Sequence, residues 1–245
     1  MSISTNSIIH YTNTLDKLKS IIKEGFRIKY CVEKLLSKKR SYGNAHPMIS
    51  FCDIPLSDSV RHFDLYGNYG IGISKEWAKK YGINPVLYID TDSRIGDALD
   101  NMQEKFEKAK DVIPPEAFNV ILMTKCFSKN YKGPLKRGKI NIPDYKFYDE
   151  REWRFVPTRE DIQNEKISIM ADVYEKDKDL YNNKLANYRY TFNHDDISYL
   201  IVKSTDEIPD MIEFLRNTFY KTLKISELDI LLSKVCSTEQ IIEDY

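Results

Sequence analysis

Closely spaced cysteines are absent from this sequence, and that absence excludes two kinds of small-protein framework. The chain of 245 residues contains four cysteines, and no two of them form a CxxC pair. Structural zinc sites and disulfide-stapled folds both need closer or more numerous cysteines. We therefore expect reduced thiols in a cytoplasmic protein. The cysteines are Cys31, Cys52, Cys126 and Cys236.

Several motifs of catalytic sites are missing as well. The four histidines form no HExxH motif and no other close ligand pair, so we expect no bound metal. The phosphate loop ending in GKS or GKT, the dinucleotide fingerprint GxGxxG and the hydrolase elbow GxSxG do not occur. The sequence therefore contains no motif that indicates simple nucleotide hydrolysis or acyl transfer.

The sequence also lacks an excess of one charge and any long apolar run. Lys plus Arg and Asp plus Glu both total 37, so the net charge gives no indication of a polyanionic partner. No apolar run reaches membrane-spanning length, and the opening MSISTNSIIHYTN lacks the basic leader and apolar core of a signal peptide. We expect a soluble cytoplasmic protein with no membrane partner.

Basic residues nevertheless gather in two short stretches. Residues 128–139, SKNYKGPLKRGK, hold five basic residues and no acidic one, and a second basic stretch runs from Lys34 to Arg40. Each stretch is either a solvated face or a contact for nucleic-acid phosphates, and either Tyr131 in the first stretch or Tyr42 after the second could stack an unpaired base. The phosphate contacts in the second interpretation are Lys132, Lys136, Arg137 and Lys139.

The hydrophobic pattern is typical of a globular protein, with 42% hydrophobic and 12% aromatic residues. Short strands mix irregularly with helices, which favours an α+β fold over a doubly wound sheet. Residues 158–193 are polar and without sustained periodicity, so we interpret 1–245 as a single domain with a peripheral insertion there. The pattern predicts strands within 7–12, 46–55, 69–74, 85–90, 152–156 and 197–204, helices over 14–25, 32–37, 57–67, 75–81, 92–112, 115–127 and 207–219, and a strand followed by a helix within 228–245.

The stretch FYDEREWRFVP, residues 147–157, places charges inside an aromatic run that predicts a strand. In an extended chain Glu152 and Arg154 share one face, while Trp153 and Phe155 take the other. A carboxylate and a guanidinium on a half-buried face form either a structural ion pair or part of an active site. The residues alone leave both interpretations open.

A second set of polar residues lies earlier in the chain. His10 and Thr12 share a face of the strand 7–12 and could hydrogen-bond a ribose and a carboxamide, although a lone histidine is also compatible with a satisfied core position. Tyr66 and Tyr69 flank the turn Gly67–Asn68, either for packing or as an aromatic wall for a planar ring.

Four blocks of sequence, in order, resemble one family. IIHYTNTLDKLKSIIKEGF, the block from MISFCDIPLS to NPVLYI, FYDEREWRFVP and FNHDDISYLIVKS are together similar to the AbiGi family of abortive phage-resistance proteins. FCDIPLS, YGIGISKEWA and EREWRFVP carry the resemblance most specifically. The family is usually described as the antitoxin side of a two-gene abortive-infection system, so the resemblance implies a cognate toxin or antitoxin as partner.

The opening of the chain also resembles DarT-like ADP-ribosyltransferases, in which a strand with His-x-Thr precedes a helix ending in Lys-Glu-Gly. In that superfamily a first-strand histidine or arginine holds NAD, an aromatic residue stacks on nicotinamide and a late-strand glutamate directs transfer. The resemblance implies NAD as the substrate and Glu152 as the catalytic residue, with Glu150 as the alternative. The residues that it implies for NAD binding are His10, Tyr11, Thr12, Tyr66, Tyr69 and Arg154.

The chemistry of this transfer suits the residue types. Cleavage of nicotinamide from ribose builds an oxocarbenium-like cation, which a buried carboxylate such as Glu152 would stabilise. Arg154 would keep Glu152 ionised or bind the pyrophosphate of NAD. The resemblance implies an ADP-ribosyltransferase-like fold with a split, bent, mixed or antiparallel sheet flanked by helices.

Two functions follow from these observations. The main hypothesis is a phage-defence toxin that acts as an NAD-dependent mono-ADP-ribosyltransferase on nucleic acid or protein. The alternative is a non-catalytic antitoxin, or a phage-sensing binding partner, in a two-gene abortive-infection system.

Overall fold

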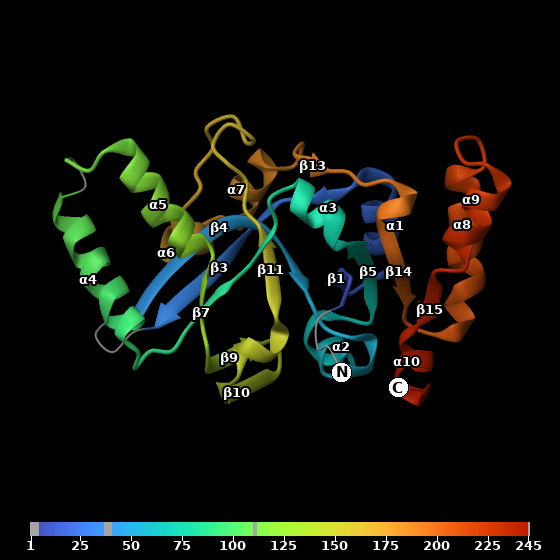
Figure 1. Cartoon of the computed structure of the whole chain (residues 1–245), viewed down its shortest axis with the longest axis horizontal. Helices are drawn as coiled ribbons and strands as arrows, with labels where there is room; N and C mark the ends of the chain where they lie inside the picture. The colour runs from blue at the N-terminus through green and yellow to red at the C-terminus, as the bar shows by residue number, and fades with distance from the viewer. Residues whose placement is uncertain (1–4, 37–40, 110–111, 245) are drawn as a thin grey trace. The chain divides into compact units, whose positions relative to one another are not determined.

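The computed structural model describes residues 5–36, 41–109 and 112–244, which fold into two compact units. Unit 1 is drawn from Met1–Arg27, Ser50–Ile83 and Arg189–Tyr245, and unit 2 from Ile28–Ile49 and Asn84–Tyr188. Each unit mixes helices with strands (Figure 1), and the sheet of unit 1 contains antiparallel and parallel pairs. The predicted α+β class with a mixed sheet is thus confirmed, while the likeness to ADP-ribosyltransferases stays a prediction.

A sheet of hydrophobic strands forms the centre of unit 1. β1 pairs antiparallel with β5 along its whole length, β5 pairs antiparallel with β14, and β14 pairs parallel with β15. On its other edge β1 meets the end of β4, where Ile9 lies opposite Cys52. Ile8, Ile71 and Ile201 are fully buried, as expected for strands covered on both faces. The strands are β1 (Ser7–Thr12), β4 (Ser41–Cys52), β5 (Tyr69–Ser74), β14 (Ile197–Val202) and β15 (Val235–Ser237), and a separate pair joins β2 (Phe26–Arg27) to β13 (Arg189–Tyr190).

The helices of unit 1 begin and end at residues that suit their positions. The side chain of Thr14 accepts a hydrogen bond from Lys17 N and caps α1, and Gly25 follows the helix with a φ of 87°. A Cβ atom at Gly25 would lie 2.6 Å from Tyr190 O, so glycine is required there. The helices are α1 (Leu15–Glu24), α2 (Val60–Tyr66), α3 (Lys75–Lys80), α8 (Ile208–Phe219), α9 (Ile225–Leu232) and α10 (Thr238–Asp244).

Unit 2 is built around β3 and the first part of β4. Eight antiparallel pairs join these strands, from Lys29 with Met48 to Leu36 with Ser41. None of the helices in the described part of the chain combines the length and apolar character needed to cross a membrane. The strands are β3 (Lys29–Leu36), β6 (Asn84–Pro85), β7 (Leu87–Ile89), β8 (Ser128–Asn130), β9 (Gly133–Arg137), β10 (Ile140–Tyr145), β11 (Glu152–Phe155) and β12 (Ile169–Met170), and the helices are α4 (Arg94–Ala109), α5 (Pro115–Cys126), α6 (Ala171–Lys176) and α7 (Lys178–Lys184).

One predicted element is wrong. Residues 32–36 belong to β3 and not to a helix, because their backbone pairs with β4 outweigh a weak local preference; Ser37 lies outside the described residues. The predicted strand followed by a helix within 228–245 is confirmed as β15 and α10, although residues 228–232 at the start of that range belong to α9. Helix α9 starts where the Glu227 side chain accepts a hydrogen bond from Lys224 N at 2.8 Å, and it buries Leu231.

The part of the polar segment 158–193 that belongs to unit 2, residues 158–188, contributes buried residues to that unit. Ile162 and Leu185 are fully buried, and β12 pairs with β4 at Ala45. Tyr174 in α6 donates from its hydroxyl to Tyr30 O at 3.0 Å, which attaches this segment to β3. Few of its residues are apolar, yet several of those few are placed in the interior of unit 2.

Candidate functional site

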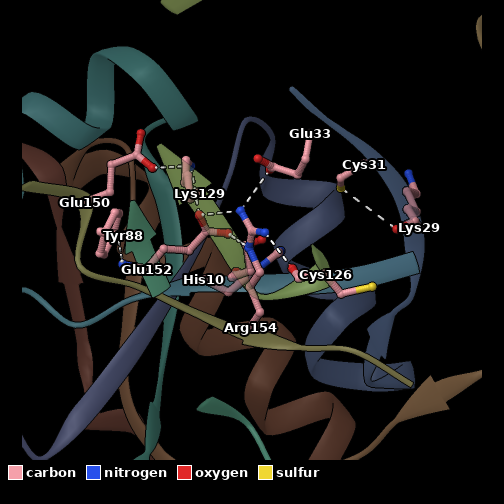
Figure 2. Close-up of polar contacts among 11 residues, drawn as sticks. His10, Lys29, Cys31, Glu33, Tyr88, Cys126, Lys129, Glu150, Glu152 and Arg154 are labelled. Atoms are coloured by element: carbon pink, nitrogen blue, oxygen red, sulfur yellow. Dashed lines mark hydrogen bonds and ion pairs between the residues drawn. The ribbon is translucent and has the colours of Figure 1, made fainter. Parts of the chain in front are cut away.

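A buried ion network surrounds β11 in unit 2 (Figure 2). Glu152 and Arg154 point to the same side of the strand, as the alternation of an extended chain predicts, and Arg154 is 0% exposed. The strand follows a 3-10 turn over Phe147–Glu150, and Arg151 adopts a left-handed conformation with φ 45° between the two. This turn leaves Glu150 as well as Glu152 buried.

Both carboxylate oxygens of Glu152 are occupied. Arg154 Nε donates to Oε1 at 2.7 Å, and Arg154 Nη2 donates to Oε2 at 3.0 Å. Lys129 Nζ in β8 donates to the same Oε2 at 2.8 Å and also to Glu150 Oε2 at 2.7 Å. Arg154 and Lys129 therefore enclose the carboxylate of Glu152 from two sides.

Two further groups complete the surroundings of Arg154. Its Nη2 lies 2.9 Å from Glu33 Oε1 in β3, and its Nη1 donates to Cys126 O at the end of α5 at 2.8 Å. The backbone N–H of Glu152 donates to the hydroxyl of Tyr88 at 2.7 Å. Three carboxylates thus meet two cations, so the network carries one more negative than positive charge when all groups are ionised.

The network keeps Glu152 ionised. Burial by itself would raise the pKa of the Glu152 carboxyl, but the charges of Arg154 and Lys129 outweigh burial and hold that pKa well below its usual range. The pKa of Lys129 is correspondingly raised, because Glu152 and Glu150 overcome its burial. An anion held in this way can stabilise a nearby cation, but it is poorly suited to accept a proton near neutral pH.

A small pocket adjoins the network on the side of Glu33. Its volume is about 40 Å³, and its wall includes Asn44, His46, Asp100 and Gln103. This space suits a few water molecules and is too small for a dinucleotide. His46 Nδ1 lies 3.0 Å from Ile167 O, and burial lowers the pKa of His46 to about 4.

The predicted nicotinamide-side residues belong to unit 1. His10 Nδ1 lies 2.8 Å from Ser50 O, and the imidazole ring contacts Phe26 and Phe51 at centroid distances of 5.4 and 5.7 Å. The neighbouring Tyr11 is a core residue whose hydroxyl donates to Ser59 Oγ at 2.9 Å. These contacts fit a satisfied histidine and a packed tyrosine.

The remaining unit 1 residues lie where two strands begin and end. Thr12 is buried at the end of β1, opposite Tyr69 at the start of β5. The hydroxyl of Tyr69 donates to Glu207 Oε1 at 2.9 Å, and burial raises the pKa of Tyr69 to about 12. The ring of Tyr66 stacks on His62 at a centroid distance of 5.9 Å.

The structure therefore pairs Glu152 with Arg154 in unit 2 and places His10, Thr12 and Tyr69 on adjoining strands of unit 1. An NAD-binding role for either group stays a proposal, and the ion pair between Glu152 and Arg154 is the part of the prediction that the contacts support.

The predicted phosphate contacts lie on the β9–β10 hairpin of unit 2 or directly before it (Figure 1). All four side chains belong to exposed residues, and Lys132 Nζ lies 3.9 Å from Asp144 Oδ1. The rings of Tyr131 and Tyr148 stand 5.6 Å apart beneath Lys146 Nζ. Residues 37–40 of the second basic stretch lie outside the described residues. The four contacts are Lys132, Lys136, Arg137 and Lys139.

Among the described residues, no group of three or more His, Cys, Asp or Glu side chains is arranged to hold a metal ion. Sequence reasoning missed Lys129, Glu33 and Tyr88, which complete the network. Local patterns could not separate them from solvated residues. The sequence signal that could have pointed to them is Arg154. An arginine inside a strand predicted to be buried needs more than one acceptor group around its guanidinium.

Comparisons with known proteins agree on one family. A family model described as "Putative abortive phage resistance protein AbiGi, antitoxin" matches residues 24–203. The chain is also similar to a protein of Lactococcus lactis subsp. cremoris named "Abortive phage resistance protein AbiGi", with 28% identity over 220 residues, 81% of this chain and 88% of that protein. No solved structure matches the chain.

Proposed function

Because the chain belongs to the AbiGi family of abortive phage-resistance proteins, we propose that it is the antitoxin of a two-gene system and acts by binding its cognate toxin. The description of the matching family as an antitoxin supports this role. In this proposal the protein contributes a folded surface, and the buried ion network stabilises that fold instead of performing chemistry.

The state of Glu152 is the observation that carries the proposal. A carboxylate that directs transfer to an acceptor needs a free oxygen for the ribose hydroxyl or the nucleophile. Three hydrogen bonds from Arg154 and Lys129 at 2.7 to 3.0 Å engage both oxygens of Glu152 and fill most of the roughly four acceptor positions of a carboxylate. This arrangement is what a structural ion network requires.

NAD-dependent ADP-ribosyl transfer remains the second candidate. It is favoured by one observation, namely that Glu152 is both ionised and buried, the condition in which a carboxylate best stabilises an oxocarbenium-like cation. In this candidate the basic hairpin of unit 2 contacts a nucleic-acid acceptor.

One growth experiment separates the two candidates. The chain is expressed alone, and together with the product of the neighbouring gene, as wild type, as Glu152→Gln and as the control Asp149→Asn. Asp149 is an exposed carboxylate three residues away, so Asp149→Asn makes the same replacement of a carboxylate by an amide outside the network. We expect the wild-type chain to be harmless alone and to restore growth when its partner is expressed.

The transferase makes the opposite prediction. Expressed alone, it stops growth and lowers cellular NAD, and Glu152→Gln abolishes both effects at equal soluble protein while Asp149→Asn does not. That result would overturn the antitoxin proposal.

A further inference from the structure

The β9–β10 hairpin of unit 2 forms a two-stranded sheet of its own (Figure 1). Arg137 at the end of β9 lies opposite Ile140 at the start of β10, and a turn of two residues, Gly138 and Lys139, joins the strands. Gly138 has the positive φ, 56°, that the first position of such a tight turn can require. Most residues of both strands are exposed, so the hairpin presents two faces to a partner.

The base of the hairpin is tied to the rest of unit 2. Tyr131 N donates to Ile89 O at 2.8 Å, and Tyr148 N donates to Tyr131 O at 3.2 Å. The rings of Tyr131 and Tyr148 also pack at a centroid distance of 5.6 Å. From Gly133 to Arg137 the strand β9 extends about 14 Å at the usual rise of an antiparallel strand. The tip of the hairpin therefore lies well away from its attached base.

Positive charges occupy both faces of this tip. Lys136 and Arg137 are consecutive in β9, so their side chains point to opposite faces of the hairpin. Lys139 extends from the turn, and all three residues are exposed. Asp144 is the one acidic residue in the sequence from Gly133 to Tyr145, and it lies towards the base, 3.9 Å from Lys132 Nζ. The tip is thus positive on every side.

Charges on both faces suit an element that lies inside a groove of nucleic acid. The major groove of B-DNA is about 12 Å wide and about 8.5 Å deep, admits a two-stranded β-ribbon and has phosphates along both of its walls. The hairpin is longer than this groove is deep, and its two strands lie about 4.8 Å apart. A single strand laid along a protein surface needs cations on one face only. The major groove of duplex RNA is too narrow for side chains to read. Duplex DNA is therefore the polyanion that fits best.

The prolines of the hairpin argue against a protein strand as the occupant. Pro134 in β9 and Pro143 in β10 each lack a backbone N–H. A partner strand that adds to the edge of a sheet needs a continuous row of backbone donors and acceptors. Recognition by this hairpin must consequently come from its side chains, and those at the tip are cations.

We infer that the β9–β10 hairpin binds duplex DNA, with its tip in the major groove. Lys136 and Lys139 contact phosphates of the two walls, and Arg137 has the fork geometry to contact either a phosphate or the O6 and N7 atoms of a guanine. Lys132 at the base contacts a phosphate outside the groove. This inference goes beyond the proposed antitoxin function and does not depend on it.

The test measures DNA binding by the purified full chain at several salt concentrations. We expect it to bind a fluorescent DNA duplex of about 20 base pairs, with an affinity that falls as salt rises because counterions are released. The triple variant Lys136→Gln, Arg137→Gln, Lys139→Gln should lower the affinity at low salt about tenfold or more. It should also reduce the slope of log affinity against log salt by about 2 to 3, since each lost phosphate contact removes nearly one unit. Urea denaturation checks that the variant is folded.

A second triple variant provides the matched control. Lys105→Gln, Lys108→Gln, Lys176→Gln removes the same three positive charges from exposed lysines of unit 2 that lie outside the hairpin. The control should change the affinity by less than about twofold and leave the slope as in the wild type, because it alters the net charge without altering the contact surface.

Several outcomes would overturn the inference. They are the absence of duplex binding by the wild-type chain, and an equal affinity and slope for the wild type and the hairpin variant. Tighter binding of a single strand or an RNA duplex of the same length would also contradict it, because the tip would then not lie in the major groove of DNA. So would a hairpin variant that loses binding to the product of the neighbouring gene while DNA binding is unaffected, since the hairpin would then bind protein.

The growth experiment keeps this inference apart from the proposed function. A wild-type chain that restores growth without binding DNA overturns the inference and leaves the antitoxin proposal standing. A chain that binds DNA through the hairpin but does not restore growth supports the inference and overturns the antitoxin proposal.

Discussion

At the scale of single residues, Arg154 controls what Glu152 can do. A fully buried guanidinium is stabilised only while its carboxylate partners remain, and the carboxylates in turn depend on it. Glu152 gains a low pKa from this pairing and gives up most of its hydrogen-bond acceptor positions to Arg154 and Lys129. The same contacts that make Glu152 a plausible electrostatic stabiliser therefore make it an unsuitable proton acceptor.

Replacing Arg154 should be among the most damaging single changes in unit 2. Arg154→Met leaves the three carboxylates of the network with Lys129 as their one remaining cation, so we expect the free energy of unfolding to fall by about 3–5 kcal/mol. Urea denaturation measures this change. Arg137→Met, on the exposed hairpin, serves as the control and should shift the free energy by less than about 0.5 kcal/mol. Equal effects of the two changes would contradict the account of the network.

The buried histidine His46 makes the stability of unit 2 depend on pH in mildly acidic solution. Burial lowers its folded-state pKa to about 4 from an ordinary value of 6.5, so the unfolded chain binds the proton more readily. Stability is therefore greatest above pH 6.5 and is lost as the pH falls towards 4, by about 3 kcal/mol from this residue. We expect His46→Gln to remove that part of the pH dependence in urea denaturation between pH 7 and 4. A variant that loses stability in parallel with the wild type over this range would refute the assignment.

At the scale of elements, the close approach of two segments in unit 1 depends on Gly67. This residue ends α2 with a φ of 108°, and a Cβ atom there would lie 2.3 Å from Thr12 O at the end of β1. A side chain would strain the backbone and also push the start of β5 away from β1.

Gly67→Ala should therefore lower the free energy of unfolding by about 2 kcal/mol or more. Gly82→Ala is the matched control, because Gly82 also has a positive φ, of 65°, but has open space where a Cβ would be. The control should lose only about 1 kcal/mol from backbone strain. Thermal or urea denaturation compares the two, and an equal loss would show that the approach to Thr12 does not matter.

Some helices and strands could be predicted from the sequence, and others could not. Elements with strong local signals were predicted well: the alternation in β11 and the helical periodicity over 14–25, observed as α1, both act between neighbouring residues. β3 was missed because its eight pairs with β4 are contacts between segments. Lys129 was missed for a similar reason, since its partners Glu150 and Glu152 follow it by more than twenty residues.

At the scale of the whole molecule, the chain passes repeatedly between its two units. Unit 1 takes three separate segments of the sequence and unit 2 takes two, and β4 contributes its first part to one and its last residues to the other. Neither unit corresponds to a continuous piece of gene. Trimming the protein from either end would therefore remove strands or helices from unit 1 before reaching any boundary, and a deletion series would report loss of folding at every step. Mapping of partner contacts in this family thus calls for point substitutions in the intact chain, and an early stop codon should yield a fragment that the cell degrades instead of a working half.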